Sequence, residues 1–250
     1  MAGHSKWNNI KRRKESQDAK KAKIFTKLSK EIYAAVRSGG EDPTTNLRLR
    51  MALTKARAEN IPSDNIERTI KKAAGNSENI QYEEITYEGY GPGGVAVMVK
   101  ALTDNRNRTA AEIRHAFSRN GGNLGENGCV SFLFDRKGQL IIERNEEMDE
   151  DEVMLDAAEA GAEEIESEED IYLIETETED FEDVKNNLEQ KGYLFTKAEV
   201  TMIPQTTTNL SNEDAETLIQ LIEKLEDNDD VQYVYHNFEM TEEQLHQFVN

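Results

Sequence analysis

The sequence predicts an α+β protein of several domains: a basic N-terminal helical bundle and two α+β, ferredoxin-like domains, the second inserted in the first. Its 250 residues exceed what one ordinary core needs. Charge is divided unevenly, with 18 Lys/Arg against 8 Asp/Glu in residues 1–72 and 12 against 42 in residues 73–250. Hydrophobic spacing is helical up to about residue 78 and strand-like immediately after it.

Several classes of protein are excluded by simple features of the chain. The single Cys129 allows no internal disulfide and agrees with a reducing compartment. No apolar run approaches the ~20 residues of a membrane span. The first residues are charged, with no apolar segment behind them that would direct secretion. We therefore expect a cytoplasmic protein without a membrane partner.

Residues 1–17 form a strongly basic segment that we expect to be a mobile arm until it meets a partner. It has few core-forming side chains besides Trp7 and Ile10. Unpaired ammonium groups are too costly to bury. The arm must therefore face water or a polyanion.

A helix is predicted from about Asp18, because Phe25, Leu28, Ile32 and Val36 recur at helical spacing. A second stripe lies within about an 80° arc on roughly the opposite side of this helix. It consists of Lys20, Lys23, Lys27 and Lys30. An ordinary solvated face is the alternative. We favour a binding face because the acids that usually alternate with lysines are missing and the adjoining arm has the same sign.

Two further helices complete the predicted helical domain, residues 1–78. Residues 44–59 carry apolar side chains on more than one face, so we expect the most buried helix there. Pro62 breaks that pattern, and a last helix then runs up to Gly75.

Residues 80–103 predict two strands joined by the turn Gly91-Pro92-Gly93-Gly94. The glycines match no phosphate-loop or dinucleotide motif, so a plain turn is favoured. Arg106 and Arg108 follow at a strand-to-helix junction. They suit a phosphate or base contact, and they suit equally well capping of the helix and bracing of the loop.

Residues 137–204 predict an acidic inserted domain. Their strands and helices follow the order β-α-β-β-α-β, which is the ferredoxin-like arrangement. Residues 145–183 contain 20 Asp/Glu and no Lys or Arg, so phosphates would be repelled. No EF-hand pattern occurs, and solvated carboxylates explain the acids better than a metal site does.

The segment before this insertion, residues 79–136, lacks one helix and one strand of an α/β sandwich. Residues 205–240 supply one of each, since Leu218, Leu221, Ile222 and Leu225 form a helical stripe followed by a strand from Val231. We therefore expect 79–136 and 205–240 to form one middle domain. Residues 241–250 are expected to be a loose tail.

Long strings in the chain resemble the YebC/PmpR family. The match spans residues 1–238, with small departures at Cys129, often serine in the family, and Ile61, often methionine. The strings are Gly3-His4-Ser5-Lys6-Trp7, Gly39-Gly40 with Asp42-Pro43, Asn60-Ile61-Pro62 with Asp64-Asn65-Ile66, Tyr87-Glu88-Gly89-Tyr90-Gly91-Pro92-Gly93-Gly94, Leu102-Thr103-Asp104-Asn105-Arg106-Asn107-Arg108-Thr109, and Gly121-Gly122 with Leu124-Gly125.

The resemblance implies three domains, the two α+β domains lying around a cleft. It also implies one of two activities. Some members are described as DNA-binding transcriptional regulators. Others, including mitochondrial relatives, are described as translational activators that bind ribosomal RNA and help ribosomes through proline-rich stretches.

No catalytic constellation is visible in the sequence. The four histidines are scattered, Cys129 reads as a small core residue, and no hydrolase or zinc motif occurs. We therefore expect a non-enzymatic, nucleic-acid-binding regulator with no cofactor, metal or small-molecule substrate. A ribosome-associated translation factor and a protein–protein adaptor acting through the acidic domain are the alternatives.

The expected nucleic-acid contacts come from the arm, the first helix and the loop after the second strand. His4 would hydrogen-bond and Trp7 would stack, while the cations would bind phosphates. Lysines around a single Trp suit binding to RNA better than they suit reading of the DNA major groove. The predicted residues are His4, Lys6, Trp7, Lys11, Arg12, Arg13, Lys14, Lys20, Lys23, Lys27, Lys30, Arg106 and Arg108.

Overall fold

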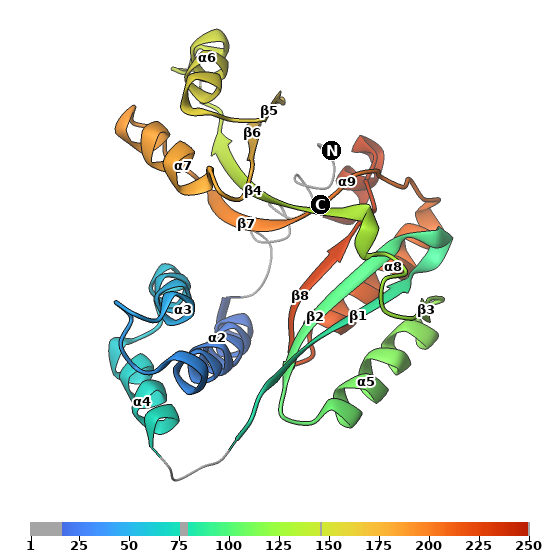
Figure 1. Cartoon of the computed structure of the whole chain (residues 1–250). Coiled ribbons are helices and arrows are strands. Elements are labelled where there is room, and N and C mark those ends of the chain that lie inside the picture. The colour runs from blue at the N-terminus through green and yellow to red at the C-terminus, as the bar shows by residue number, and fades with distance from the viewer. Residues whose placement is uncertain (1–16, 76–79, 146, 250) are drawn as a thin grey trace. The chain divides into compact units, whose positions relative to one another are not determined.

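The structure is a computed structural model, and it describes residues 17–75, 80–145 and 147–249 (Figure 1). The described residues fall into two compact units. Residues 132–207 form one, which we call the acidic unit. The other combines residues 17–131 with residues 208–249, so the chain leaves it and later returns to it. We call it the basic unit after the excess of Lys and Arg over Asp and Glu in its first part, residues 17–72.

The basic unit begins with three helices, α2 (Gln17–Gly39), α3 (Leu47–Ala58) and α4 (Ser63–Ala74). Helix α2 is central, because it packs against both of the others. Its buried stripe includes Leu28 and Ile32, as the spacing predicts.

The expectation that residues 44–59 form the most buried helix is wrong. The side chains of Leu47 and Met51 are 59% and 47% exposed. Only a single stripe of α3 is buried, at spacings of three and four residues: Leu49, Ala52, Leu53 and Ala56. The apolar residues on its other face are therefore surface residues.

A four-stranded antiparallel sheet follows, in the order β3-β1-β2-β8. Strands β1 (Glu83–Tyr90) and β2 (Ala96–Thr103) are joined by a short turn, Pro92–Gly94, in which Gly93 and Gly94 have φ of 63° and 79°. Glycine is favoured where φ is positive. Gly93 and Gly94 therefore form a plain turn, as the sequence predicted.

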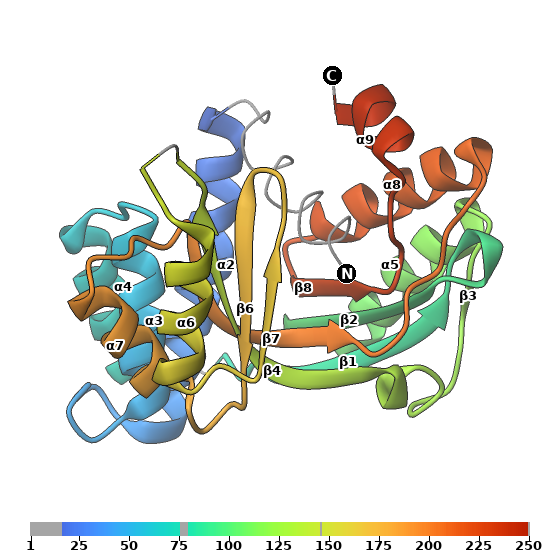
Figure 2. The same ribbon diagram turned by 90° about the horizontal axis from the view of Figure 1, so that it is seen from above.

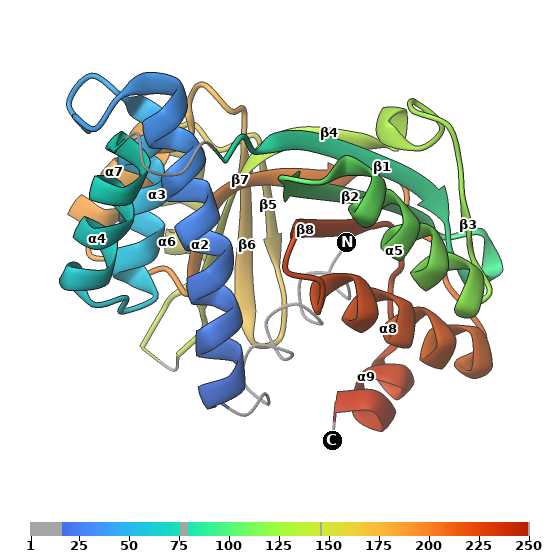
Figure 3. The ribbon, with the colours of Figure 1, turned by 90° about the horizontal axis from the view of Figure 1, so that it is seen from below.

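The sheet is completed from the far end of the chain. Strand β8 (Val231–His236) pairs antiparallel with β2, and the short β3 (Asn123–Leu124) pairs with β1. Helices α5 (Arg106–Arg119) and α8 (Asn212–Glu226) lie side by side and cover one face of the sheet (Figure 3). The shared core draws on all three elements: Val97, Val99, Ile113, Phe117, Leu218, Leu221 and Ile222.

The acidic unit contains a second antiparallel sheet, in the order β5-β6-β4-β7. Helices α6 and α7 lie side by side and pack on it (Figure 2). Tyr172, Ile174 and Leu188 are among its fully buried side chains. The elements are β4 (Phe134–Glu143), α6 (Glu150–Ala160), β5 (Glu164–Ser167), β6 (Ile171–Thr176), α7 (Phe181–Gln190) and β7 (Lys197–Pro204).

The predicted domain border at 136/137 falls inside a strand. A single turn of 3-10 helix, Ser131–Leu133, leads directly into β4, whose first residue Phe134 already pairs with Pro204 of β7. Gly138 does not interrupt the strand. An added Cβ there would lie 2.3 Å from Thr176 Oγ1, so the glycine serves close packing and not a turn.

The C-terminal residues are not a loose tail. Residues Glu242–Val249 form helix α9, whose Leu245 is 8% exposed and belongs to the core of the basic unit. The side chain of Gln244 donates to the carbonyl oxygen of Leu210 at 2.8 Å. The apolar side chains of this short segment were too few to reveal a helical period, but Leu245 and Phe248 are three residues apart on one face.

Replacing Leu245 by alanine should lower the free energy of unfolding by about 2–3 kcal/mol, because it removes a buried side chain and leaves a cavity. Urea unfolding measures this. The matched control E243A changes an exposed residue of the same helix and should stay within about 0.5 kcal/mol of wild type. Equal stability of the two variants would mean that α9 does not pack on the core.

Candidate nucleic-acid interface

The predicted contact residues separate into three groups. Those of the arm lie outside the described residues, and so does the side chain of Lys20, whose backbone belongs to α2. Lys23, Lys27 and Lys30 lie on α2, and Arg106 and Arg108 lie in the first turn of α5. The residues outside the description are His4, Lys6, Trp7, Lys11, Arg12, Arg13 and Lys14.

Lys23, Lys27 and Lys30, which we call the lysine stripe, contact the turn between α8 and β8. We call this turn, Glu226–Asp230, the acidic turn. Lys23 forms an ion pair with Asp227. Lys27 Nζ donates to the carbonyl oxygen of Glu226 at 2.8 Å. Lys30 Nζ donates to the carbonyl oxygen of Asp229 at 2.9 Å and to Asp230 Oδ1 at 2.6 Å.

The inner end of this contact is buried. The side chain of Asp230 is 4% exposed and that of Lys30 is 16% exposed. Asp230 Oδ2 also accepts from Arg108 Nη2 and from Thr109 Oγ1, each at 2.8 Å. Burial alone would raise the pKa of Asp230, but the hydrogen bonds from Lys30, Arg108 and Thr109 lower it to about 2. Thr103 Oγ1 donates to the same Oδ2 at 3.1 Å. Asp230 is therefore an ionised carboxylate held by four side chains.

The outer end is open to water. The side chains of Lys23 and Asp227 are 41% and 64% exposed. A pair of this kind contributes about 1 kcal/mol or less. Lys27 lies between the two ends. Burial lowers the pKa of its ammonium group, and the charge of Glu226 offsets only part of this. The contact therefore weakens from Lys30 toward Lys23.

The sequence predicted a face of free ammonium groups, and for these three lysines the structure differs. Each has an oxygen partner from the acidic turn. The run Asp227-Asn228-Asp229-Asp230 was a visible signal, but nothing in the sequence indicated that it folds back to a helix some 200 residues earlier. Contact of these lysines with phosphates stays a prediction.

Arg108 braces the loop in the way that one of the two sequence interpretations described. Its guanidinium binds Asp104 and Asp230, both at 2.8 Å, and these hydrogen bonds raise its pKa. Asn105 caps α5 by accepting from the Arg108 backbone N–H at 3.1 Å. Arg106 is exposed. Arg108 is exposed as well, but its guanidinium is paired, whereas no ion pair joins Arg106 to another described residue.

The three-helix part of the basic unit carries additional exposed cations that are not among the predicted contact residues. Arg50 and Arg57 lie seven residues apart on α3, which places them on one side of that helix. Arg68, Lys71 and Lys72 are exposed along α4. Cationic surface therefore remains on α3 and α4 even with the lysine stripe engaged.

Cys129 is held in a structural loop. The carboxylate of Glu88 is buried and accepts backbone N–H groups of Gly128, Val130 and Ser131 at 2.7–2.8 Å, which fixes the loop around the cysteine. Burial and the charge of Glu88 both raise the pKa of the Cys129 thiol. A nucleophilic cysteine needs the opposite shift.

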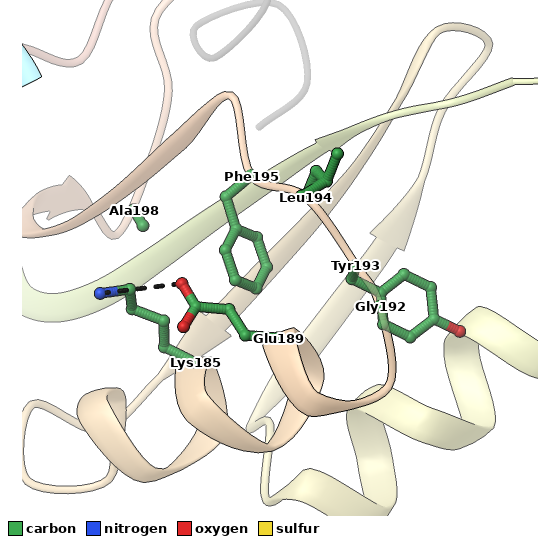
Figure 4. A pocket seen from close by; sticks show the side chains of 7 residues that line it. All are labelled: Lys185, Glu189, Gly192, Tyr193, Leu194, Phe195 and Ala198. Atoms are coloured by element: carbon green, nitrogen blue, oxygen red, sulfur yellow. Dashed lines mark ion pairs between the residues drawn. The ribbon is translucent and has the colours of Figure 1, made fainter.

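The acidic unit has an open hollow of about 480 Å³ between the end of α7 and the start of β7 (Figure 4). Its two charged side chains, Lys185 and Glu189, pair with each other at 4.0 Å. The lining contains no Ser, Cys or His: it consists of Lys185, Glu189, Gly192, Tyr193, Leu194, Phe195 and Ala198.

Among the described residues, no group of three or more His, Cys, Asp or Glu could hold a metal ion, and no helix is long and apolar enough to cross a membrane.

Basic helices joined to two antiparallel sheets with packed helices define a multidomain α+β protein. Two family models match the chain and identify its family. The TACO1/YebC protein N-terminal domain matches residues 5–76, and the TACO1/YebC second and third domain matches residues 82–238. The chain belongs to the TACO1/YebC family.

Relatives match over nearly their whole length. A "Probable transcriptional regulatory protein" of Anoxybacillus flavithermus is 61% identical over 240 residues, covering 96% of this chain and 98% of that one. "Probable transcriptional regulatory protein YrbC" of Bacillus subtilis is 57% identical over 239 residues, covering 95% and 99%. The crystal structure of the conserved hypothetical protein Aq1575 from Aquifex aeolicus is similar with a TM-score of 0.78 and 48% identity, covering 91% and 93%.

Replacing Asp230 by asparagine should lower the free energy of unfolding by about 2–3 kcal/mol at pH 7, because Lys30 and Arg108 lose their shared carboxylate. The folded-state pKa of about 2 lies below the unfolded value. The ionised group therefore contributes stability above about pH 4, and this contribution disappears as the pH falls toward 2.

Urea unfolding between pH 7 and pH 2.5 tests this expectation. The difference between wild type and D230N should shrink at the acidic end. D227N, which alters the exposed outer pair, should cost less than about 1 kcal/mol. A difference between wild type and D230N that does not depend on pH would mean that the charge of Asp230 is not what stabilises the contact.

Proposed function

We propose that the chain is a non-enzymatic, nucleic-acid-binding regulator of gene expression that grips phosphates with its basic N-terminal segment. The observation that carries the proposal is the separation of charge. Residues 1–72 carry 18 Lys/Arg against 8 Asp/Glu, in a chain whose formal net charge is −20. A positive end on a negative body favours a polyanion at one end only. The names of the relatives support a regulatory role.

The proposed contacts come from the arm, the lysine stripe and Arg106. The arm supplies most of them, with His4 for hydrogen bonding and Trp7 for stacking. The lysine stripe has an internal partner to displace, and Arg106 offers a secondary contact. The arm cations together with Lys20 are Lys6, Lys11, Arg12, Arg13, Lys14 and Lys20.

We also propose that the acidic unit is a ferredoxin-like domain inserted in the middle domain. Support comes from its β-α-β-β-α-β chain order and its sheet order β5-β6-β4-β7. The pairing of β2 with β8, across the whole insertion, supports one middle domain built from two segments. The acidic unit would then point away from bound phosphates, since like charges repel.

RNA is the target that the residue types favour. Lysines around a single Trp suit phosphate tracking and base stacking on an irregular fold. A major-groove reader would instead present Arg, Asn and Gln from one helix. A translation factor on ribosomal RNA would use the same contacts, so it is the principal alternative to a transcriptional regulator. An adaptor acting through the acidic unit would not need the arm.

Binding should show a strong salt dependence that the arm controls. Six phosphate contacts give a slope of log K against log salt of about −4 to −5. Deleting residues 2–14 should weaken binding and remove most of that slope. The measurement is fluorescence anisotropy with a labelled structured RNA and, in parallel, a DNA duplex.

A matched pair of variants separates the arm from overall charge. K11Q/R12Q/R13Q should flatten the slope by about 2–3, because three phosphate contacts are lost. K185Q/K191Q/K197Q removes the same charge from the acidic unit and should leave the slope unchanged. Equal effects of both triples, or no effect of the deletion, would overturn the proposal.

A further inference from the structure

The acidic turn presents to the lysine stripe the kind of groups that a nucleic-acid backbone would present. Lys23 faces the carboxylate of Asp227, Lys27 faces the carbonyl oxygen of Glu226, and Lys30 faces Asp229 and Asp230. These lysines are spaced at four and three residues, about 6 Å and 4.5 Å along the helix axis. Each cation of the stripe therefore already has an oxygen acceptor, as it would on a phosphate chain.

The two ends of this contact differ in how easily they can open. Asp230 is buried and is shared by Lys30, Arg108 and Thr109, so releasing it would leave a buried charge. Asp227 is exposed and binds only Lys23 among the contacts described here. The partner of Lys27 is a neutral carbonyl oxygen, for which a phosphate oxygen is the stronger acceptor.

We propose that Lys23 and Lys27 form a polyanion-binding site that the acidic turn occupies in the free protein and vacates when nucleic acid binds. Lys30 and Asp230 stay joined and act as a fixed anchor about which the outer contacts open. This inference rests on the proposed function and adds regulation to the same site. The acidic turn is an internal competitor.

The competition has a definite consequence for affinity. Only the fraction of molecules with an open outer site can use Lys23 and Lys27, so the apparent dissociation constant rises by the inverse of that fraction. A short or weakly charged ligand would be held by the arm alone. A ligand dense enough in phosphates would displace the turn and gain two more contacts, and the closed turn would thus discriminate against weak polyanions.

The test is the double variant E226Q/D227N, which removes two charges beside Lys23 and Lys27 and leaves Asp230 in place. The probe is a labelled single-stranded oligouridine, titrated by fluorescence anisotropy over a range of salt. The matched control is E213Q/E216Q, which removes the same charge from exposed positions in the first turns of α8. Thermal unfolding of all three proteins verifies that they are folded.

We expect E226Q/D227N to bind about three- to tenfold more tightly than the control at low salt. Its salt slope should be steeper by about 1.4–1.8, because two further phosphates are engaged. Adding K23Q/K27Q to the double variant should abolish both gains.

The outcomes separate this inference from the proposed function. If wild type binds through its arm and E226Q/D227N matches the control in affinity and slope, the internal competitor is overturned and the proposed function stands. If wild type and E226Q/D227N both fail to bind, both proposals are overturned. Binding that appears only in E226Q/D227N, and not in the control, supports the competitor directly.

Discussion

The fold of the basic unit depends on the cations and hydroxyl groups that bind one buried carboxylate, that of Asp230. Asp230 is buried, and a buried ionised carboxylate must be paired and hydrogen-bonded. Its partners come from segments far apart in sequence: Lys30 from α2, Thr103 from the end of β2, and Arg108 and Thr109 from the first turn of α5. One charge thus links the helical segment, the start of α5 and the strand β8 that completes the sheet.

The same compensation changes what the basic N-terminal segment can do. A stripe of lysines without interleaved acids is costly to keep together, because like charges repel along a helix. The acidic turn supplies the missing counter-charge from another part of the chain. The helix can therefore carry a high density of cations and still pack in a folded protein. A lysine of the stripe is available to a ligand only as far as the acidic turn holds it weakly. This availability increases from Lys30 to Lys23.

Local periodicity was enough to predict most elements. The order β-α-β-β-α-β expected for the acidic part of the chain is the order observed from β4 to β7, and the helix expected from Asp18 begins at Gln17. Prediction was poorer where long-range contacts decide the outcome. The apolar residues Leu47 and Met51 suggested a buried helix, but burial depends on which face finds a neighbour, and in the described structure only one stripe of α3 is buried. The border placed at 136/137 lies inside strand β4, where Gly138 packs closely against Thr176 and does not interrupt the strand.

The partner of the lysine stripe was the feature that was hardest to predict from the sequence. Charge patterning is read within a helix or a run, and Asp227 and Asp230 lie about 200 residues from the lysines that they bind. The most direct test of the account is acetylation footprinting of the free protein, followed by mass spectrometry. Lys30 and Lys27 should react much more slowly than Lys71, whose side chain is 79% exposed, and Lys23 should be intermediate. Equal reactivity of all four lysines would contradict the account, since it would mean that the acidic turn does not hold the stripe.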